Sequence, residues 1–153
     1  MRVETVSIIY QHPQILLGMK KKRFGRGKYN GFGGKVEEGE SLEESAIRET
    51  LEESGIIIKN PEQMGRILFH FIDGEQDHLV HFFKVIKFNG ELKESDEMVS
   101  KWFHINEIPY EQMWSDDKYW LPMLLSGKKF IGEFYFDLER KIKNYKLDIV
   151  NSF

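Results

Sequence analysis

Short runs of apolar residues, separated by polar and glycine-rich stretches, recur along the chain and predict a mixture of strands and helices. Apolar side chains at every second position, or a short continuous apolar run, are typical of β-strands. On this basis we expect strands at residues 3–10, 15–20, 67–71, 79–88, 102–105, 130–136 and 145–150. The turn-forming stretch 11–14 should join the first two strands, and the last two strands should pair with each other.

A helix is predicted between a functional loop at 24–39, which contains six glycines, and Gly55. Ser41 is a good N-cap, and Glu44, three residues later, completes a capping box. Inward-facing side chains then recur at helical spacing: Leu42, Ala46, Ile47, Thr50 and Leu51. A second helix should begin near 115–117 and run through residue 125. Together the elements predict an α+β fold in which a mixed β-sheet is sandwiched between helices.

Composition and charge narrow the functional classes. The 153 residues suit one compact domain, 1–153, and 41% of them are hydrophobic. A net charge of −3 argues against a protein that binds a nucleic-acid polymer through its phosphates. The absence of cysteine excludes disulfide and thiolate chemistry. No secretory signal is recognisable and no apolar run approaches the roughly 20 residues of a membrane span, so we expect a cytoplasmic monomer.

Three glutamates, Glu49, Glu52 and Glu53, share one face of the predicted first helix because they are three and four residues apart. Two unit charges about 4 Å apart repel each other by roughly 4 kcal/mol at an effective dielectric of about 20. A helix tolerates such a cluster if its face is solvated or if a cation lies among the carboxylates, and the cluster alone leaves both interpretations open. Hard oxygen ligands without nearby histidine or cysteine favour Mg²⁺, or alternatively Mn²⁺, over zinc.

The residues around this cluster carry a family resemblance. Glycine and charged side chains recur at fixed spacing over residues 34–56: Gly34, Glu40, Arg48, Glu49, Glu52, Glu53 and Gly55, with Ile56 at the end. This spacing resembles the Nudix box of the Nudix hydrolase family, and only Thr50 departs mildly, from an aliphatic residue. With each residue type at a frequency of about 0.1, such a match arises by chance in roughly one in 10⁵ sequences.

The resemblance implies the Nudix fold and a hydrolase that cleaves a nucleoside diphosphate linked to another group. The implied catalytic residues lie on one helix: Arg48, Glu49, Glu52 and Glu53. The implied metal ligands are oxygen atoms of Gly34, Glu49, Glu52, Glu53 and Glu97. Arg48 would orient a glutamate through an ion pair, while Glu53, with Glu97 as its rival, would take the proton of the attacking water. Cations are needed because a carboxylate-rich surface repels a triphosphate.

A narrower resemblance covers residues 5–137. Segments similar to the animal-type oxidised-purine nucleoside triphosphatases of this family lie at 16–21, 24–25, 30–36, 94–98, 113–120, 128–130 and 134–136. The resemblance implies these substrate-binding residues: Thr5, Lys20, Phe24, Asn30, Phe32, Gly33, Gly34, Lys35, Trp114, Ser115, Asp116 and Asp117. Within this set Thr5 and Lys20 would reach the sugar and the phosphates.

The other implied roles concern the base. Asn30, which offers a donor and an acceptor together, would read the purine edge with Asp116 and Asp117. Trp114 and Phe24 would form the walls of the pocket that holds the base. Two adjacent carboxyl groups in an aromatic pocket cannot both stay ionised cheaply, so one can hold a proton and donate it to a base carbonyl. Without the resemblance, the two acids would be interpreted as first-turn residues favoured by the helix dipole.

The expected function is Mg²⁺-dependent hydrolysis of a small-molecule substrate, an oxidised purine (deoxy)nucleoside triphosphate such as 8-oxo-dGTP, to the monophosphate and pyrophosphate. Tyr29 and Ser115 stand where that group has Trp and Pro, which leaves base specificity open; Ser115 could cap the second helix. Two alternatives remain. One is a Nudix pyrophosphatase acting on methylated, undamaged or cap-derived purine nucleotides or on dinucleoside polyphosphates. The other is a non-catalytic nucleotide-binding module, which the presence of Glu52 and Glu53 disfavours.

Overall fold

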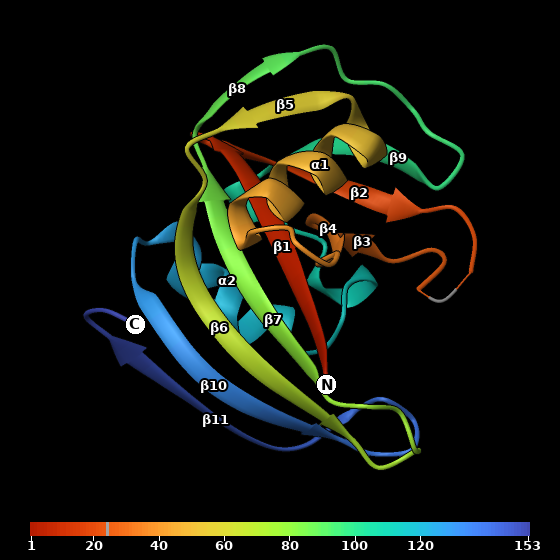
Figure 1. Ribbon diagram of the computed structural model, residues 1–153, viewed down its shortest axis with the longest axis vertical. Coiled ribbons are helices and arrows are strands. Elements are labelled where there is room, and N and C mark those ends of the chain that lie inside the picture. The colour runs from red at the N-terminus through yellow and green to blue at the C-terminus, as the bar shows by residue number, and fades with distance from the viewer. Residues whose placement is uncertain (24) are drawn as a thin grey trace.

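The computed structural model of the protein describes residues 1–23 and 25–153. Figure 1 shows how its elements are arranged. In chain order they are β1 (Arg2–Gln11), β2 (Gln14–Lys20), β3 (Tyr29–Asn30), β4 (Phe32–Lys35), α1 (Leu42–Ser54), β5 (Ile56–Lys59), β6 (Glu62–Phe71), β7 (His78–Val85), β8 (Lys87–Gly90), β9 (Met98–His104), the 3₁₀ turns η1 (Ile105–Glu107) and η2 (Tyr110–Gln112), α2 (Asp117–Leu125), β10 (Lys129–Phe136) and β11 (Ile142–Val150).

The main sheet is mixed and has the strand order β11-β10-β6-β7-β1-β2-β3, with β4 paired to β1 and β9 paired to β2. The pairs β1–β7 and β6–β10 are parallel, and the other pairs are antiparallel. β1 and β2 form the predicted hairpin, and β10 and β11 pair as expected. β5 and β8 form a separate two-stranded ribbon. The predicted α+β architecture with a mixed sheet is therefore confirmed.

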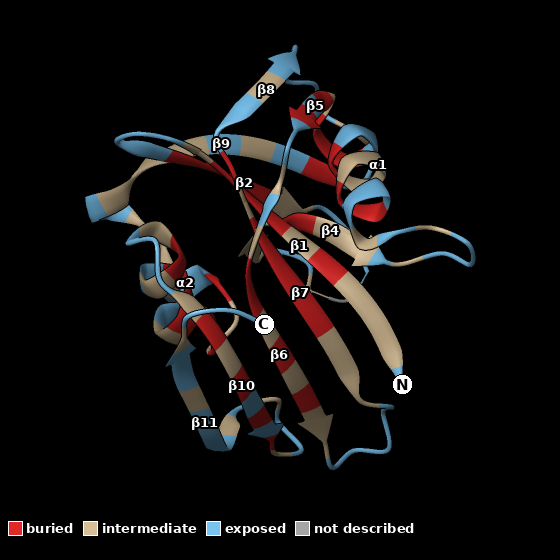
Figure 2. Cartoon of the chain, turned by 60° about the vertical axis from the view of Figure 1, so that its left-hand side comes forward, coloured by how far each residue is buried: buried red, intermediate tan, exposed pale blue. Residues whose placement is uncertain are grey.

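Successive side chains of β1 point to opposite faces of the sheet and divide the core into two layers. Ile8 belongs to the layer that packs under α2 with Leu121, whereas Ile9 belongs to the layer that packs under α1 with Ala46. In Figure 1 α1 lies in front of β1 and α2 lies behind the sheet. The buried residues run along the central strands between these helices, as Figure 2 shows. The two helices thus cover opposite faces of the sheet.

The prediction of an unbroken loop at 24–39 was wrong, because β3 and β4 lie within it. β4 pairs with β1 so that Gly33 lies opposite Val6 and Gly34 lies opposite Thr5. A Cβ atom on Gly33 would lie 1.7 Å from the Thr5 carbonyl oxygen. Glycine weakens an isolated strand, but here it permits an approach that no other residue allows.

Other element boundaries also moved. The single strand predicted at 79–88 is two strands, since β7 ends at Val85 and β8 begins at Lys87. β5 was not predicted, and it pairs with β8 at the edge of the molecule. Both predicted helices are present. Across the described ranges, 1–23 and 25–153, no helix has the length and apolar character needed to cross a membrane.

Truncation of Leu121 in α2 should destabilise the fold strongly, because its side chain is fully buried against the sheet. We expect Leu121→Ala to lower the free energy of unfolding by about 2–5 kcal/mol. Leu138→Ala is the matched control, since Leu138 is 69% exposed, and it should change stability by less than about 0.5 kcal/mol. Urea denaturation of the two variants makes the comparison; equal losses would contradict the assignment of α2 to the core.

Candidate active site

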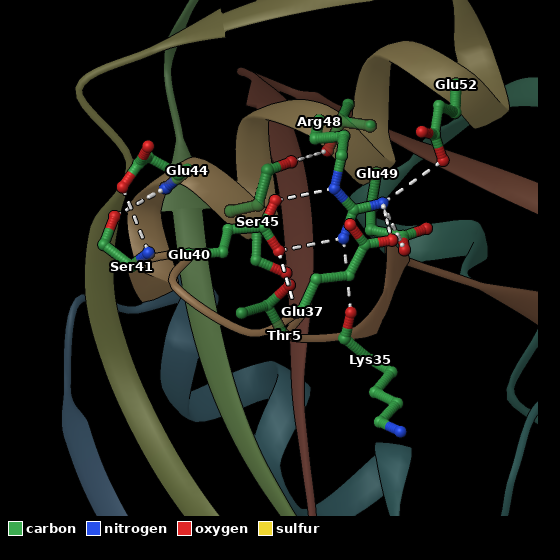
Figure 3. Close-up of polar contacts among 12 residues, drawn as sticks. Thr5, Lys35, Glu37, Glu40, Ser41, Glu44, Ser45, Arg48, Glu49 and Glu52 are labelled. Atoms are coloured by element: carbon green, nitrogen blue, oxygen red, sulfur yellow. Dashed lines mark hydrogen bonds and ion pairs between the residues drawn. The ribbon is translucent and has the colours of Figure 1, made fainter.

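The ends of α1 are defined by local hydrogen bonds that set the register of its glutamates. The Ser41 side chain accepts a hydrogen bond from the Glu44 amide at 3.0 Å, and the Glu44 carboxylate accepts one from the Ser41 amide at 3.1 Å. Figure 3 shows this reciprocal pair, which is the predicted capping box. At the other end Gly55 has a φ of +82° and donates to the Leu51 carbonyl. Both helix signals in the sequence are therefore confirmed.

Glu53 is buried, with 8% of its surface exposed, and it faces β4. The Gly33 amide donates a hydrogen bond to its Oε1 at 2.8 Å. Burial raises the pKa of Glu53 to about 8; the Gly33 hydrogen bond opposes this effect and the negative charges of Glu49 and Glu97 add to it. Lys20 is the cation that favours its ionised form. The ionised form of Glu53 therefore needs a further positive charge nearby to be stable.

Arg48 connects the acidic face of α1 to the segment before the helix (Figure 3). Its Nε and Nη2 atoms donate to both carboxylate oxygens of Glu40, at 2.6 and 2.9 Å. Its Nη1 atom donates to Glu49 at 2.9 Å and to Glu52 at 3.3 Å, and Nη2 also reaches the Lys35 carbonyl oxygen at 3.2 Å. These contacts hold the pKa of Glu40 at about 2 and orient Glu49. The arrangement matches the orienting role implied for Arg48.

Glu49 lies between Arg48 and the backbone of β4. Burial raises the pKa of its carboxyl group, and the hydrogen bond and charge of Arg48 oppose this shift. A Cβ atom on Gly34 would lie 2.8 Å from the Glu49 carboxylate, so a larger residue here would displace that carboxylate. The Glu52 side chain is 59% exposed, and among the described residues Arg48 is its ion-pair partner. Glu97 is exposed, forms an ion pair with Arg23 at 3.5 Å, and faces Glu53 closely enough to affect its pKa.

A cavity of about 550 Å³ extends from Glu53 across the face of the sheet that α2 covers. The predicted site residues that line it come from distant parts of the chain: Thr5, Lys20, Asn30, Gly33, Gly34, Glu53, Trp114, Asp116 and Asp117. Its volume lies in the range of small-molecule sites, roughly 300–1,000 Å³. Another hollow, of about 480 Å³, lies over β6, β10 and β11 and contains none of the predicted residues. Glu53 and most of the predicted substrate-binding residues therefore gather in the first cavity, whereas Arg48, Glu49, Glu52 and Glu97 are not among the described residues that line it.

Asp116 and Asp117 are both buried, each with 6% of its surface exposed. The Trp120 indole nitrogen donates a hydrogen bond to Asp116 Oδ2 at 2.8 Å. Burial raises the pKa of both carboxyl groups, and the neighbouring Asp116 charge raises that of Asp117 further. Asp116 is the N-cap of α2 but makes no capping hydrogen bond with its side chain. Burial therefore favours the protonated forms of this pair inside the cavity, and the Asp116 side chain does not cap the helix.

The comparisons with known proteins agree with this geometry. The NUDIX domain family matches residues 1–124. The chain is 44% identical to an oxidized purine nucleoside triphosphate hydrolase of Mus musculus over 152 residues, which cover 99% of this chain and 97% of the relative. It is 47% identical to the protein of the same name from Danio rerio, over 95% and 94% of the two chains.

The protein belongs to the Nudix family. A crystal structure of a mutator MutT protein from Bacillus halodurans superposes with a TM-score of 0.86 and 32% identity, and covers 97% of this chain and 98% of that one. Nudix hydrolases act on small nucleotide substrates with the help of divalent metal ions.

The donor set of this Nudix box fits a divalent cation. Its side chains are all carboxylates, the hard oxygen ligands that Mg²⁺ and Mn²⁺ prefer. Within the described ranges no three histidine, cysteine or acidic side chains already converge as a metal cluster, because Arg48 holds Glu49 and Glu52 while Gly33 holds Glu53. A bound cation would compete with Arg48 and would offset the buried charge of Glu53.

Some residues implied by the resemblance lie away from the cavity. Phe32 is fully buried in the core layer beneath α1. Lys35 is exposed and contributes its backbone carbonyl to Arg48. Ser115 does not cap α2, contrary to the expectation, because Asp116 occupies the N-cap position and the Ser115 hydroxyl is buried without a hydrogen-bond partner. Phe24 lies outside the described residues.

The floor of the Nudix cavity contains residues that the sequence did not single out for binding. Phe69, Phe71 and Phe136 line it, and the ring of Phe136 stacks on both others at centroid distances of 5.7 and 5.6 Å. His78 and Glu4 complete the floor and are paired at 3.3 Å. The alternation of side chains along β6 and β10 could have indicated these residues, since it places the phenylalanines on one face of each strand.

In the metal-free protein the buried Glu53 should make stability fall as the pH rises. Its pKa of about 8 in the folded state exceeds the value of 4.5 for an ordinary glutamate, so between these values the folded protein holds a proton that the unfolded chain has released. Urea denaturation in EDTA at about pH 6 and about pH 8.5 should show a larger loss for the wild type than for Glu53→Gln. Glu52→Gln is the control and should follow the wild type; parallel behaviour of the wild type and Glu53→Gln would contradict the assignment.

Proposed function

We propose that this protein hydrolyses oxidised purine (deoxy)nucleoside triphosphates such as 8-oxo-dGTP to the monophosphate and pyrophosphate, with Mg²⁺ as its cofactor. The observation that carries the proposal is a buried pair of adjacent carboxyl groups, Asp116 and Asp117, in the same cavity as Glu53. The names of the mouse and zebrafish relatives agree with this substrate class.

The proposed reaction places the triphosphate beside the glutamates of α1. A bound divalent cation would polarise the phosphates and lower the pKa of a water molecule. Glu53, oriented by the Gly33 amide, accepts the proton of the water that attacks phosphorus, and a raised pKa suits a general base that works near neutral pH. Glu49, Glu52, Glu97 and the Gly34 carbonyl are the other proposed cation ligands. Lys20 lies at the same end of the cavity and can bind a phosphate oxygen.

The opposite end of the cavity would hold the base. Asn30 offers both a donor and an acceptor to the purine edge. Asp116 and Asp117 can present one carboxylic acid and one carboxylate, so the pair can donate to a base carbonyl while accepting from a base N–H. Trp114 supplies an aromatic wall over this part of the cavity.

We also propose that the chain acts as one domain and as a monomer in the cytoplasm. One sheet runs continuously from β1 near the start of the chain to β11 near its end, which supports a single folding unit. The proposed small nucleotide substrate fits a cavity built entirely from residues of one chain.

Replacement of Glu53 should abolish turnover without removing binding. With Mg²⁺ and 8-oxo-dGTP, the wild type should release pyrophosphate, and Glu53→Gln should lower kcat by about 100-fold or more because the general base is lost. Glu62→Gln, on the exposed start of β6, is the matched control and should keep wild-type kcat. No turnover of any nucleotide by a folded, Mg²⁺-loaded wild type would contradict the proposal and favour a binding module.

Replacement of Asp116 or Asp117 should alter the selectivity for the base more than the rate of hydrolysis. Asp116→Asn and Asp117→Asn each remove a titratable carboxyl group, so the ratio of kcat/KM for 8-oxo-dGTP to that for dGTP should fall by about tenfold or more. The exposed Asp148→Asn variant controls for the loss of one negative charge. Steady-state kinetics on a panel of oxidised, methylated and normal purine nucleotides measure the ratio; unchanged selectivity would refute the assigned role.

A further inference from the structure

Lys28 contacts two residues that line the cavity, Asn30 and Trp114, and its backbone is held in place by three hydrogen bonds. Its amide donates to the Gly25 carbonyl at 3.0 Å, and its carbonyl accepts from the Lys20 amide at 3.2 Å. The same carbonyl accepts a hydrogen bond from the side-chain amide of Asn30 at 3.2 Å. Because this contact uses an N–H of Asn30, it sets which end of the amide faces the cavity. Lys28 therefore orients a residue of the purine-reading set through its backbone.

The side chain of Lys28 reaches a different wall of the same cavity. Its Nζ atom lies over the indole of Trp114, 5.0 Å from the ring centroid. This distance falls within the roughly 6 Å that defines a cation–π contact. Lys28 is half-buried, so its ammonium group is partly removed from water. The contact joins the segment before β3 to the segment before α2 across the cavity mouth.

The charge of the same ammonium group also acts on Asp117 of the buried acid pair. Its positive charge favours the ionised form of Asp117, whereas burial and Asp116 favour the protonated form. Other polar groups around the pair come from every neighbouring element. They are Trp120 on α2, Tyr110 on η2, Lys20 and Arg23 at the mouth, and Glu4, His78 and Arg140 on the floor.

We propose that Lys28 is a positioning residue of the base pocket, whose backbone orients Asn30 while its ammonium group braces Trp114 and supplies a positive charge to the Asp116–Asp117 pair. The inference rests on the proposed function, because it assigns the purine to this pocket. Lys28 acts through the groups that read the base and does not touch the reacting phosphorus.

The test measures binding of the proposed product, 8-oxo-dGMP, without metal, by calorimetry from about pH 6 to about pH 9. Lys28→Met keeps the length of the side chain but removes its charge, so it should weaken binding by about threefold to tenfold. It should also move the pH at which affinity changes upward by about half a unit, since the pair then keeps its proton longer. Lys28→Arg should keep the wild-type affinity and the wild-type pH dependence. Lys22→Met, in the same exposed loop, controls for a general loss of charge.

A double variant tests whether the pH effect of Lys28 depends on the acid pair. In Asp117→Asn the additional Lys28→Met change should still weaken binding but should no longer move the pH profile. Wild-type-like affinity and pH profile in Lys28→Met, or an Arg variant that behaves like Met, would overturn the inference. A wild type that neither binds 8-oxo-dGMP nor hydrolyses its triphosphate would instead refute the proposed function, so the two failures are distinguishable.

Discussion

The hydrogen bond from the Gly33 amide to the buried Glu53 carboxylate connects the acidic helix to the central sheet. It forms only because β4 approaches β1 where Gly33 has no side chain. A buried carboxylate costs free energy unless charge and hydrogen bonds compensate it, and here one amide and the charge of Lys20 compensate it only in part. The same constraint that shapes the strand pairing therefore leaves a negative site that a divalent cation can complete.

One cavity is lined by Glu53 from the acidic cluster of α1 and by Asp116 and Asp117 at the start of α2, and the two acidic groups reduce their repulsion differently. On α1, Arg48 neutralises Glu49 while Glu53 stays partly uncompensated beside β4. At the start of α2, Asp116 and Asp117 are buried, and burial favours their protonated forms instead. A cation site and a pair of buried carboxyl groups suit the two ends of a nucleotide, since phosphates need positive charge and a purine edge needs donors and acceptors. The position of β1 between the helices sets the distance between them.

Features of the structure that depend on residues close together in the chain were predicted correctly. The capping box of Ser41 and Glu44, the terminal Gly55 and the helical spacing of the glutamates all involve contacts within a few residues. The strand β4 was missed because its glycines have low intrinsic strand preference, and its close approach to Thr5 explains why it forms. The strand β3 was missed because it is only two residues long. Phe32, implied as a substrate contact, is a core residue because its strand turns it toward α1.

The sequence by itself determined the two helices, most of the longer strands, the adjacent acids at 116 and 117, and the spacing that shows the Nudix box. Only the tertiary structure decided that Glu40 and the Lys35 carbonyl hold Arg48, that Phe69 and Phe136 form the cavity floor, and that Lys28 lies over Trp114. The physical reason is that the first set rests on periodicity and local hydrogen bonds. The second set depends on strand order and on close approach between distant segments, which no local pattern encodes.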